Sequence, residues 1–585
     1  MNGVVLVTFK IQKILTVRRA TSKYKDNPKD VEEFLLTTTT TGTPLTYRDV
    51  RNFKNDNTQN IDTQMDDLLS KELLGLSLQD RNAIQDEIHG VQTLAPEETP
   101  DMIKAALNNL SIEISMISDS QKVAYNRSQG ITSSSTSSTA TSTSSSTSYI
   151  NSPDFRLRFL RCDLFNVKKA ALRIVNFVDL ILEIFGDFAL HRPIQMTDFN
   201  RDELQVFRIG LQQLLPYRDR SGRRIFACVG GFGLHTPLMT RVKILIYTML
   251  AASDDVETQR KGITSIVWPG RKPVAGDNAS SVKWDRVLFM KRIYENLPIR
   301  TCSIHFCLPD TPVFQIMRSL IVLTMPSYRH RMKFHVGENV ELQYTVQGYG
   351  IPIELLPLTD TGNIKTAYLK QWMKLRRILE VMKMTEQNRN EHGQLKEEFE
   401  GTTNGGGGGG GADDVSANAN NDDMSVITNT SFTSNLSAGS QESIIECPGS
   451  FDVIFRSGTA MACHPGNVRF RCLIESNLEN PHVVSHMTQA ELAEQLIEEI
   501  EMKGGRFLRW DTRGYWVEIK DGLQIHTKVS LSIRDYKYKT KAQRNRQTNQ
   551  SFTYLFQCQD GNLSKKRKTN DFQQQQQQLL RQQQR

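Results

Sequence analysis

The sequence has few cysteines, and they are not arranged in pairs. Its 585 residues include eight cysteines, with no CxxC step and no regular spacing of a disulfide framework. Several lie in apolar runs, where cysteine behaves as a small hydrophobic residue. The pattern predicts buried, reduced thiols and excludes a small disulfide-stabilised secreted fold.

Long hydrophobic runs and catalytic motifs are also missing. No apolar stretch approaches the roughly 20 residues that span a bilayer, so we expect no transmembrane segment. There is no GxSxG, HExxH or Walker A sequence, and the glycine run Gly405–Gly411 lacks the flanking strand and helix of a phosphate-binding loop. His305, His330 and His335 have no acidic or thiol neighbour at ligand spacing, so we interpret them as sheet-edge or surface residues. We predict a non-enzymatic protein with no catalytic residues, metal or cofactor.

Positive charge is concentrated at one end of the chain. Residues 501–585 hold 18 Lys and Arg against 7 Asp and Glu, a net of +11, so the first 500 residues sum to −3 of the total +8. A polyanionic partner is therefore a hypothesis for the C-terminal end alone. A basic cluster, Lys565–Lys568, is compatible with nuclear import, and we expect a cytoplasmic and/or nuclear protein.

Low-complexity stretches divide the chain. A length of 585 residues exceeds what one core sustains, and runs of Ser/Thr, Gly/Asn/Ser and Gln cannot build one. The basic start, Met1–Lys25, fits either an organelle-targeting peptide or a disordered terminus. The expected divisions are a disordered 1–60, an acidic helical segment 61–130, a Ser/Thr linker 131–150, an α/β module 151–385, a Gly/Asn/Ser linker 386–448, a basic α+β module 449–545 and a disordered basic, Gln-rich tail 546–585.

The stretch Gly262–Leu358 organises the central module. An apolar run at 262–268, a helical segment after it and a second apolar run, Ile299–Leu308, predict a βαβ unit with parallel strands. The next helix, Pro312–Met325, carries only Arg318 as a charge. A helix with almost no polar face lies either deep in a core or over an apolar ligand.

The order of these elements resembles the CRAL-TRIO lipid-binding family. The resemblance is carried by Leu308–Gly337, by the Ile-Pro and Leu-Pro steps in Tyr349–Gly362, by the helical Pro153–Phe177, and by Tyr217–Gly230 with its charged Asp-x-x-Gly-Arg turn. It covers about residues 151–385. The resemblance implies an α/β module with a helical N-terminal part, in which the Pro312–Met325 helix covers a lipid pocket.

Candidate lipid contacts follow from that resemblance. A pocket and its covering helix would include Phe226, Ile266, Phe306, Phe314, Met317, Leu320 and Ile321. A basic rim of Arg329, Arg331 and Lys333 could meet a lipid phosphate or an anionic membrane surface. The competing interpretation is a core collapsed onto itself without a pocket.

The C-terminal module combines helices with a hairpin. Thr488 and Glu491 form a capping-box pattern, Asn467 is placed to cap an earlier helix, and Asp511–Gly514 is the expected hairpin turn. With its His-Pro-Gly-Asn step at His464–Asn467, this module resembles an uncharacterised domain of diatom and related algal proteins. The family's Gly-Arg-Gly turn is replaced here by Arg456-Ser457-Gly458.

Helix, helix, hairpin and basic helix is an order compatible with a winged-helix-like reader of nucleic acid. The candidate contacts are Arg506, Arg509, Arg513, Lys528, Arg534 and Lys537. An acidic protein is the other candidate partner for this module. We therefore expect a lipid-binding, lipid-transfer or lipid-sensing module fused to a basic interaction module. The alternative is a nuclear nucleic-acid-binding regulator whose CRAL-TRIO-like part is a protein scaffold without ligand.

Overall fold

A computed structural model describes residues 70, 74–130, 148–230, 236–269, 284–400, 443–456, 458–480 and 486–542. The predicted disordered N-terminus with its basic start, nearly all of the Ser/Thr linker, the glycine run and the tail with its Lys565–Lys568 cluster lie outside these residues. Helices and strands are both present, as expected for a mixed α/β and α+β chain. Across the described ranges, no helix is both long enough and apolar enough to cross a bilayer.

The described residues form two compact units. The first takes the chain up to residue 450 together with 456–465 and 510–517, and the second takes 451–455, 466–509 and 518 onward. Part of the stretch that we assigned to a separate C-terminal module, 449–545, therefore belongs to the first unit.

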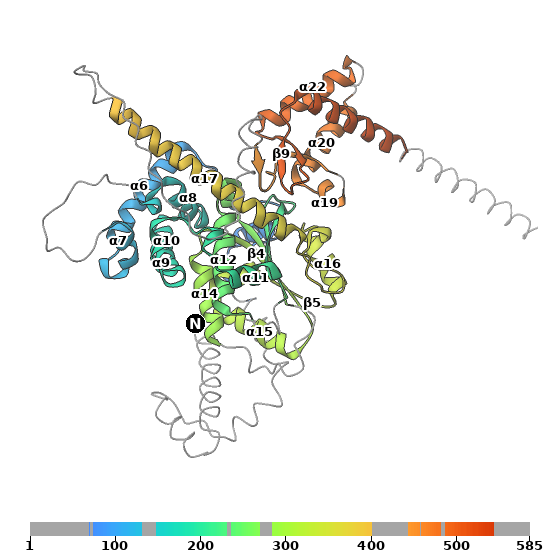
Figure 1. Cartoon of the computed structure of the whole chain (residues 1–585). Coiled ribbons are helices and arrows are strands. Elements are labelled where there is room, and N and C mark those ends of the chain that lie inside the picture. Colours follow the sequence, from blue (N-terminus) through green and yellow to red (C-terminus); the bar gives the residue numbers. More distant parts are fainter. Residues whose placement is uncertain are drawn as a thin grey trace, which may run out of the picture. The chain divides into compact units, whose positions relative to one another are not determined.

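The first unit begins with a helical part (Figure 1). Helix α9 contacts α6, α7, α8 and α10. It buries Ala170, Ile174, Phe177 and Ile181, whose spacing of three or four residues places them on one face. The helices are α5 (Leu78–Ile88), α6 (Pro100–Met116), α7 (Val123–Ser128), α8 (Pro153–Cys162), α9 (Val167–Phe185), α10 (Phe188–His191) and α11 (Arg201–Ile209). Ser77 caps α5, and the predicted helical segment 61–130 is interrupted after Met116, where the chain becomes extended at Ile117.

A five-stranded sheet follows, in the order β1-β2-β3-β4-β5. Strands β2 to β5 are parallel, and β1 is antiparallel to β2. The strands are β1 (Gln212–Arg218), β2 (Arg224–Val229), β3 (Ile263–Trp268), β4 (Thr301–Leu308) and β5 (Met332–Val336). The connecting helices are α12 (Leu238–Ala252), α13 (Val256–Lys261), α14 (Trp284–Asn296), α15 (Pro312–Thr324), α16 (Asn339–Gly348) and α17 (Ala367–Glu400).

The sheet begins before the Asp-x-x-Gly-Arg turn. Gln212–Arg218 is the edge strand β1, which lies largely upstream of the Tyr217–Gly230 stretch that carried the resemblance. Pro216 fits there because an edge strand can spare a backbone donor, and the pairing with β2 shifts register between Leu214 and Arg218. At the other end of the module, α17 continues to Glu400, beyond the predicted end at Met384.

Residues 443–448 were assigned to the linker, and this assignment is wrong. Ile444–Ile445 is strand β6, which pairs antiparallel with Val517 and Trp516 of strand β9 (Trp516–Glu518). Cys447, Pro448 and Ser450 are buried in the first unit. The short helix α19 (Thr459–Ala462) lies in this unit as well.

The second unit has its own apolar core. Strand β7 (Val453–Phe455) runs parallel to strand β8 (Phe507–Trp510), and its helices are α20 (Pro465–Glu479), α22 (Gln489–Met502) and a helix over 522–542. The core residues include Val453, Ile474, Leu496, Phe507 and Val529. The capping box of Thr488 and Glu491 is confirmed in this unit. The predicted hairpin turn is also confirmed, in residues that belong to the first unit, where Gly514 donates to the Asp511 carbonyl.

Candidate functional site

The apolar face of β4 and β5 lies against α15. Phe306 and Phe334 are register partners whose rings stack with centroids 4.9 Å apart. Phe314, from the first turn of α15, is only 1% exposed, and Met317 and Ile321 are half-buried against the same cluster. The buried members are Ile304, Phe306, Leu308, Phe314, Met325 and Met332. Four of the seven predicted lipid contacts therefore meet beneath or on α15.

The other three predicted lipid contacts do not join this cluster. Phe226 is buried in the large core of the helical part. Ile266 is the register partner of His305, whereas its neighbour Val267 pairs with Phe306. Ile266 thus points to the opposite face of the sheet, because successive residues of a strand alternate between faces. Leu320 belongs to α15, but its side chain is not among those described.

The only charge in α15 is also turned toward the sheet. The Arg318 guanidinium lies 5.4 Å from the centroid of the Phe334 ring, in cation–π geometry. Arg318 therefore does not open a polar face on this helix, and α15 presents apolar and aromatic contacts to β5.

The predicted basic rim is not an open rim. Arg331 donates to the Glu87 carboxylate at 2.5 Å, and Lys333 donates to the Gln85 side chain at 2.9 Å. Lys333 is one residue out of phase with Phe334, so it faces α5 and not α15. Arg329 is buried and donates to the Val322 carbonyl at 2.5 Å. The structure thus places these three side chains in contacts within the chain, and binding of a lipid phosphate by them stays a prediction.

Helix α5 covers the face of the sheet opposite to α15. Glu87 is fully buried, and it accepts hydrogen bonds from Arg300, Arg331 and the Leu94 amide. Burial alone would raise the pKa of Glu87, but Arg300 and Arg331 outweigh it and hold the pKa below its usual value. The acidic helical segment is thus fixed to the sheet by a buried carboxylate.

Two of the histidines lie on the same face as α5. His305 is fully buried on β4, contrary to our assignment to the sheet edge or surface, and its Nδ1 lies 3.1 Å from Nε2 of His335. Tyr349 stacks on His89 and meets His305 edge-on, with ring centroids 4.6 Å apart in both pairs. Burial lowers the pKa of His335 to about 4 and that of His305 well below its usual value. Among the described residues no group of three or more His, Cys, Asp or Glu is arranged to hold a metal ion.

The predicted nucleic-acid contacts of the hairpin are engaged within the chain. Arg506 pairs with Asp452 at 2.8 Å, and Arg513 pairs with Asp511 at 2.9 Å. Arg509 is half-buried on β8. Two of the three predicted arginine contacts are therefore paired with a carboxylate of the same chain.

The predicted contacts of the C-terminal helix differ from those of the hairpin. The Lys528 ammonium lies 5.3 Å from the centroid of the Phe455 ring, while Arg534 and Lys537 are exposed. Tyr538 and Lys541 extend the same exposed side at helical spacing. The structure therefore separates the predicted set, and the exposed basic surface lies on the helix over 522–542.

The His-Pro-Gly-Asn step has a structural role that the sequence did not indicate. Asn467 does not cap a helix; its side chain accepts from the Ile454 amide at 2.8 Å and donates to the Ile454 carbonyl at 2.9 Å, as a neighbouring strand would. A Cβ on Gly466 would lie 2.0 Å from the Asp452 carbonyl oxygen. Asn and Gly are therefore required because the start of α20 runs against β7.

The comparison with known families concerns this C-terminal region. Residues 452–535 match the model of a family described as "Domain of unknown function (DUF6824)". The match includes Gly466 and Asn467, the capping box of α22, the hairpin and most of the basic helix. No curated protein matches the chain.

Proposed function

We propose that the first unit is a CRAL-TRIO-like module that binds a lipid between α15 and the face of β4 and β5. In this proposal the module acts by lipid binding, transfer or sensing and not by catalysis. The observation that carries it is the placement of the nearly uncharged α15 directly on the apolar face that bears Phe306 and Phe334.

The chemistry of this contact suits an acyl chain. Burial of an apolar side chain away from water contributes roughly 1.5–3 kcal/mol of favourable free energy. Burial of that side chain against a hydrocarbon ligand contributes the same. Met317 and Ile321 are half-buried, and Met side chains adapt readily to irregular apolar shapes. Because the described side chains of α15 rest on the sheet, a ligand enters by displacing α15 from Phe306.

The test uses the full chain purified from cells. Native mass spectrometry and lipid extraction are expected to return one bound lipid per chain. Ile321→Asp, which places a carboxylate against the ligand, and Phe306→Trp, which fills its space without adding charge, are each expected to reduce the bound fraction at least tenfold. Val340→Asp on α16, where Val340 is 49% exposed, is the matched control and is expected to retain lipid. Wild-type protein without lipid would contradict the proposal.

A second function is supported for the C-terminal region. The exposed positions Arg534, Lys537 and Lys541 form a basic side of the helix over 522–542, and a row of cations suits a phosphate backbone or an acidic protein. We propose nucleic acid as its partner. In the alternative, the first unit is a protein scaffold without ligand, and a lipid-free wild type that still binds DNA would favour that alternative.

A further inference from the structure

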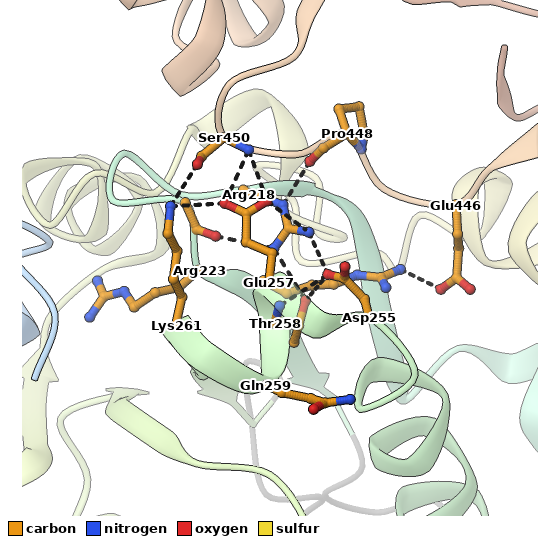
Figure 2. Close-up of polar contacts among 12 residues, drawn as sticks. Arg218, Arg223, Asp255, Glu257, Thr258, Gln259, Lys261, Glu446, Pro448 and Ser450 are labelled. Carbon is orange, nitrogen blue, oxygen red and sulfur yellow. Dashed lines mark hydrogen bonds and ion pairs between the residues drawn. The ribbon is translucent and has the colours of Figure 1, made fainter. Parts of the chain in front are cut away.

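A short segment after the Gly/Asn/Ser linker contacts the first unit in a specific way. Residues 444–450, called the strap below, contact β2, α13 and α17 of this unit. Figure 2 shows Glu446, Pro448 and Ser450 of the strap beside Arg218, Asp255 and Glu257. The sequence of the strap is Ile-Ile-Glu-Cys-Pro-Gly-Ser, and 43 residues, 401–443, separate it from α17 along the chain.

The strap's carboxylate is bound at three points. Oε1 of Glu446 accepts from Arg224 at 2.6 Å and from the Trp372 indole at 2.8 Å, and Oε2 accepts from Arg376 at 3.1 Å. The side chains of Arg224 and Arg376 are only 1% and 7% exposed. Buried guanidinium groups that converge on one carboxylate form a built anion site, with geometry that a lone surface ion pair lacks.

The arginines differ in what else they bind. Arg376 also pairs with Asp254 at 3.0 Å, so it keeps an acidic partner without the strap. Arg224 otherwise donates only to the Leu215 carbonyl, at 3.4 Å, among the contacts described. Without Glu446 its buried charge would lose its acidic partner, which is costly in a protein interior.

The end of the strap is recognised through its backbone. Arg218 donates to the Pro448 carbonyl at 2.7 Å and is held in place by Asp255 (Figure 2). The Ser450 amide donates to both oxygens of Glu257, at 3.0 and 3.1 Å, and Lys261 donates to the Ser450 hydroxyl at 2.6 Å. The contacts of Pro448 and of the Ser450 amide are made by the backbone, so they depend on its path and not on the identity of a side chain.

Gly222 allows this close approach. Its φ is +86°, and a Cβ on Gly222 would lie 2.9 Å from the Ser450 Cβ and 2.6 Å from the Lys261 Nζ. Gly222 belongs to the Asp-x-x-Gly-Arg turn between β1 and β2, and Arg224 follows this turn as the first residue of β2. The turn therefore provides the space for the strap, and the start of β2 provides a charge for its carboxylate.

We infer that Arg218, Arg224, Trp372 and Arg376 form a peptide-recognition site for a segment with one carboxylate two residues before Pro-Gly, and that the chain's own strap is its ligand. This site is separate from the proposed lipid site, which lies at β4, β5 and α15. If the strap is recognised in this way, the polypeptide after the linker is expected to stay bound to the rest of the first unit even when the linker is cut.

The test uses the full chain with a protease site inserted in the run Gly405–Gly411. After cleavage, the two pieces are expected to elute together with the mass of one chain, and dilution gives their dissociation constant. Glu446→Ala is expected to raise this constant about 100-fold, because the buried Arg224 loses its ion-pair partner and Arg376 loses one of its acidic partners. Glu446→Gln, which keeps an acceptor for Trp372, is expected to give a smaller increase.

Glu494→Ala on α22 is the matched control, since Glu494 is exposed, and its dissociation constant is expected to equal that of the wild type. Circular dichroism of the uncut variants shows whether each is folded. An unchanged constant for a folded Glu446→Ala, or immediate separation of the wild-type pieces, would overturn the inference. A mass of two chains before cleavage would show that a second copy supplies the strap, which overturns recognition within one chain. The lipid content of the uncut variants is measured in parallel, so failure of the strap and failure of the lipid proposal are distinguished.

Discussion

The Glu87 carboxylate of α5 lies 2.5 Å from the Arg300 guanidinium, just before β4, and both side chains are almost fully buried, at 0% and 6% exposed. Because 213 positions separate the two residues, this pair fixes the acidic helical segment to the sheet of the first unit. Arg331 donates a hydrogen bond to the other carboxylate oxygen of Glu87. A buried carboxylate with two guanidinium partners is costly to break, because removing it leaves two buried cations.

Glu87→Ala is expected to destabilise the first unit by about 3–5 kcal/mol, the usual cost of removing one partner of a buried pair. Urea unfolding followed by circular dichroism measures this change. Asp86→Ala, one position earlier and only partly buried, is the control and is expected to change stability by less than about 0.5 kcal/mol. Equal stability of the two variants would show that the Glu87 pair does not hold α5.

The histidine pair predicts how stability depends on pH. Burial lowers the pKa of His335 from 6.5 to about 4, so the folded state disfavours its protonation. The stability that this group contributes is complete above pH 6.5 and is lost as pH falls from 6.5 toward 4, because the unfolded chain takes up the proton first. We expect a loss of at most about 1.4 kcal/mol per pH unit from His335 in this window.

His335→Asn is expected to reduce that slope, as measured by urea unfolding at pH values from 7 to 4.5. His486→Gln is the control, because His486 is exposed and belongs to the second unit, whereas the His305–His335 pair belongs to the first. If the stability of His335→Asn falls with decreasing pH as steeply as that of the wild type, His335 is not the source of the pH dependence.

Local patterns in the sequence predicted the elements that depend on neighbouring residues. The Thr488 capping box, the Asp511–Gly514 turn and the apolar runs of β3 and β4 were identified because each is encoded within a few positions. The faces of the sheet could not be assigned in the same way. Every residue of β4 is buried, so no alternation of polar and apolar residues distinguishes the face of Phe306 from that of His305. Ile266 was therefore placed on the wrong side.

Contacts between distant segments had no local signal. Nothing near Arg331 or Lys333 indicates that α5, more than 240 positions earlier, takes up their charges. In the same way, Glu446 lies in a stretch that is typical of a linker, and its role depends on Arg224 and Arg376. The partners of the basic-rim residues and of Glu446 could not be predicted, because the position of a charge in the sequence does not reveal which distant residue pairs with it.

Gly466 provides a test of the second unit. Gly466→Ala places a methyl group 2.0 Å from the Asp452 carbonyl oxygen, so β7 or α20 must move. We expect a loss of about 1–3 kcal/mol or more in the stability of this unit, since overpacking against backbone cannot be relieved by a side-chain rotation. Thermal unfolding measures the change. Gly522→Ala, where a Cβ would meet nothing within 4 Å, is the control and is expected to leave the melting temperature within a few degrees of wild type.

The exposed side of the C-terminal helix provides a test of nucleic-acid binding. Arg534→Gln combined with Lys537→Gln is expected to weaken binding of the full chain to duplex DNA and to lower the slope of log affinity against log salt by about 2, one for each lost phosphate contact. Fluorescence anisotropy at several salt concentrations gives both quantities.

Arg513→Gln is the matched control. Because Arg513 is already paired with Asp511, this substitution is expected to change the slope by much less than about 1, the value for one phosphate contact. If wild-type affinity does not fall with salt, phosphate contacts are excluded and an acidic protein becomes the better candidate partner. If Arg513→Gln lowers the slope as much as the helix changes do, the hairpin contributes to the interface despite its internal ion pairs.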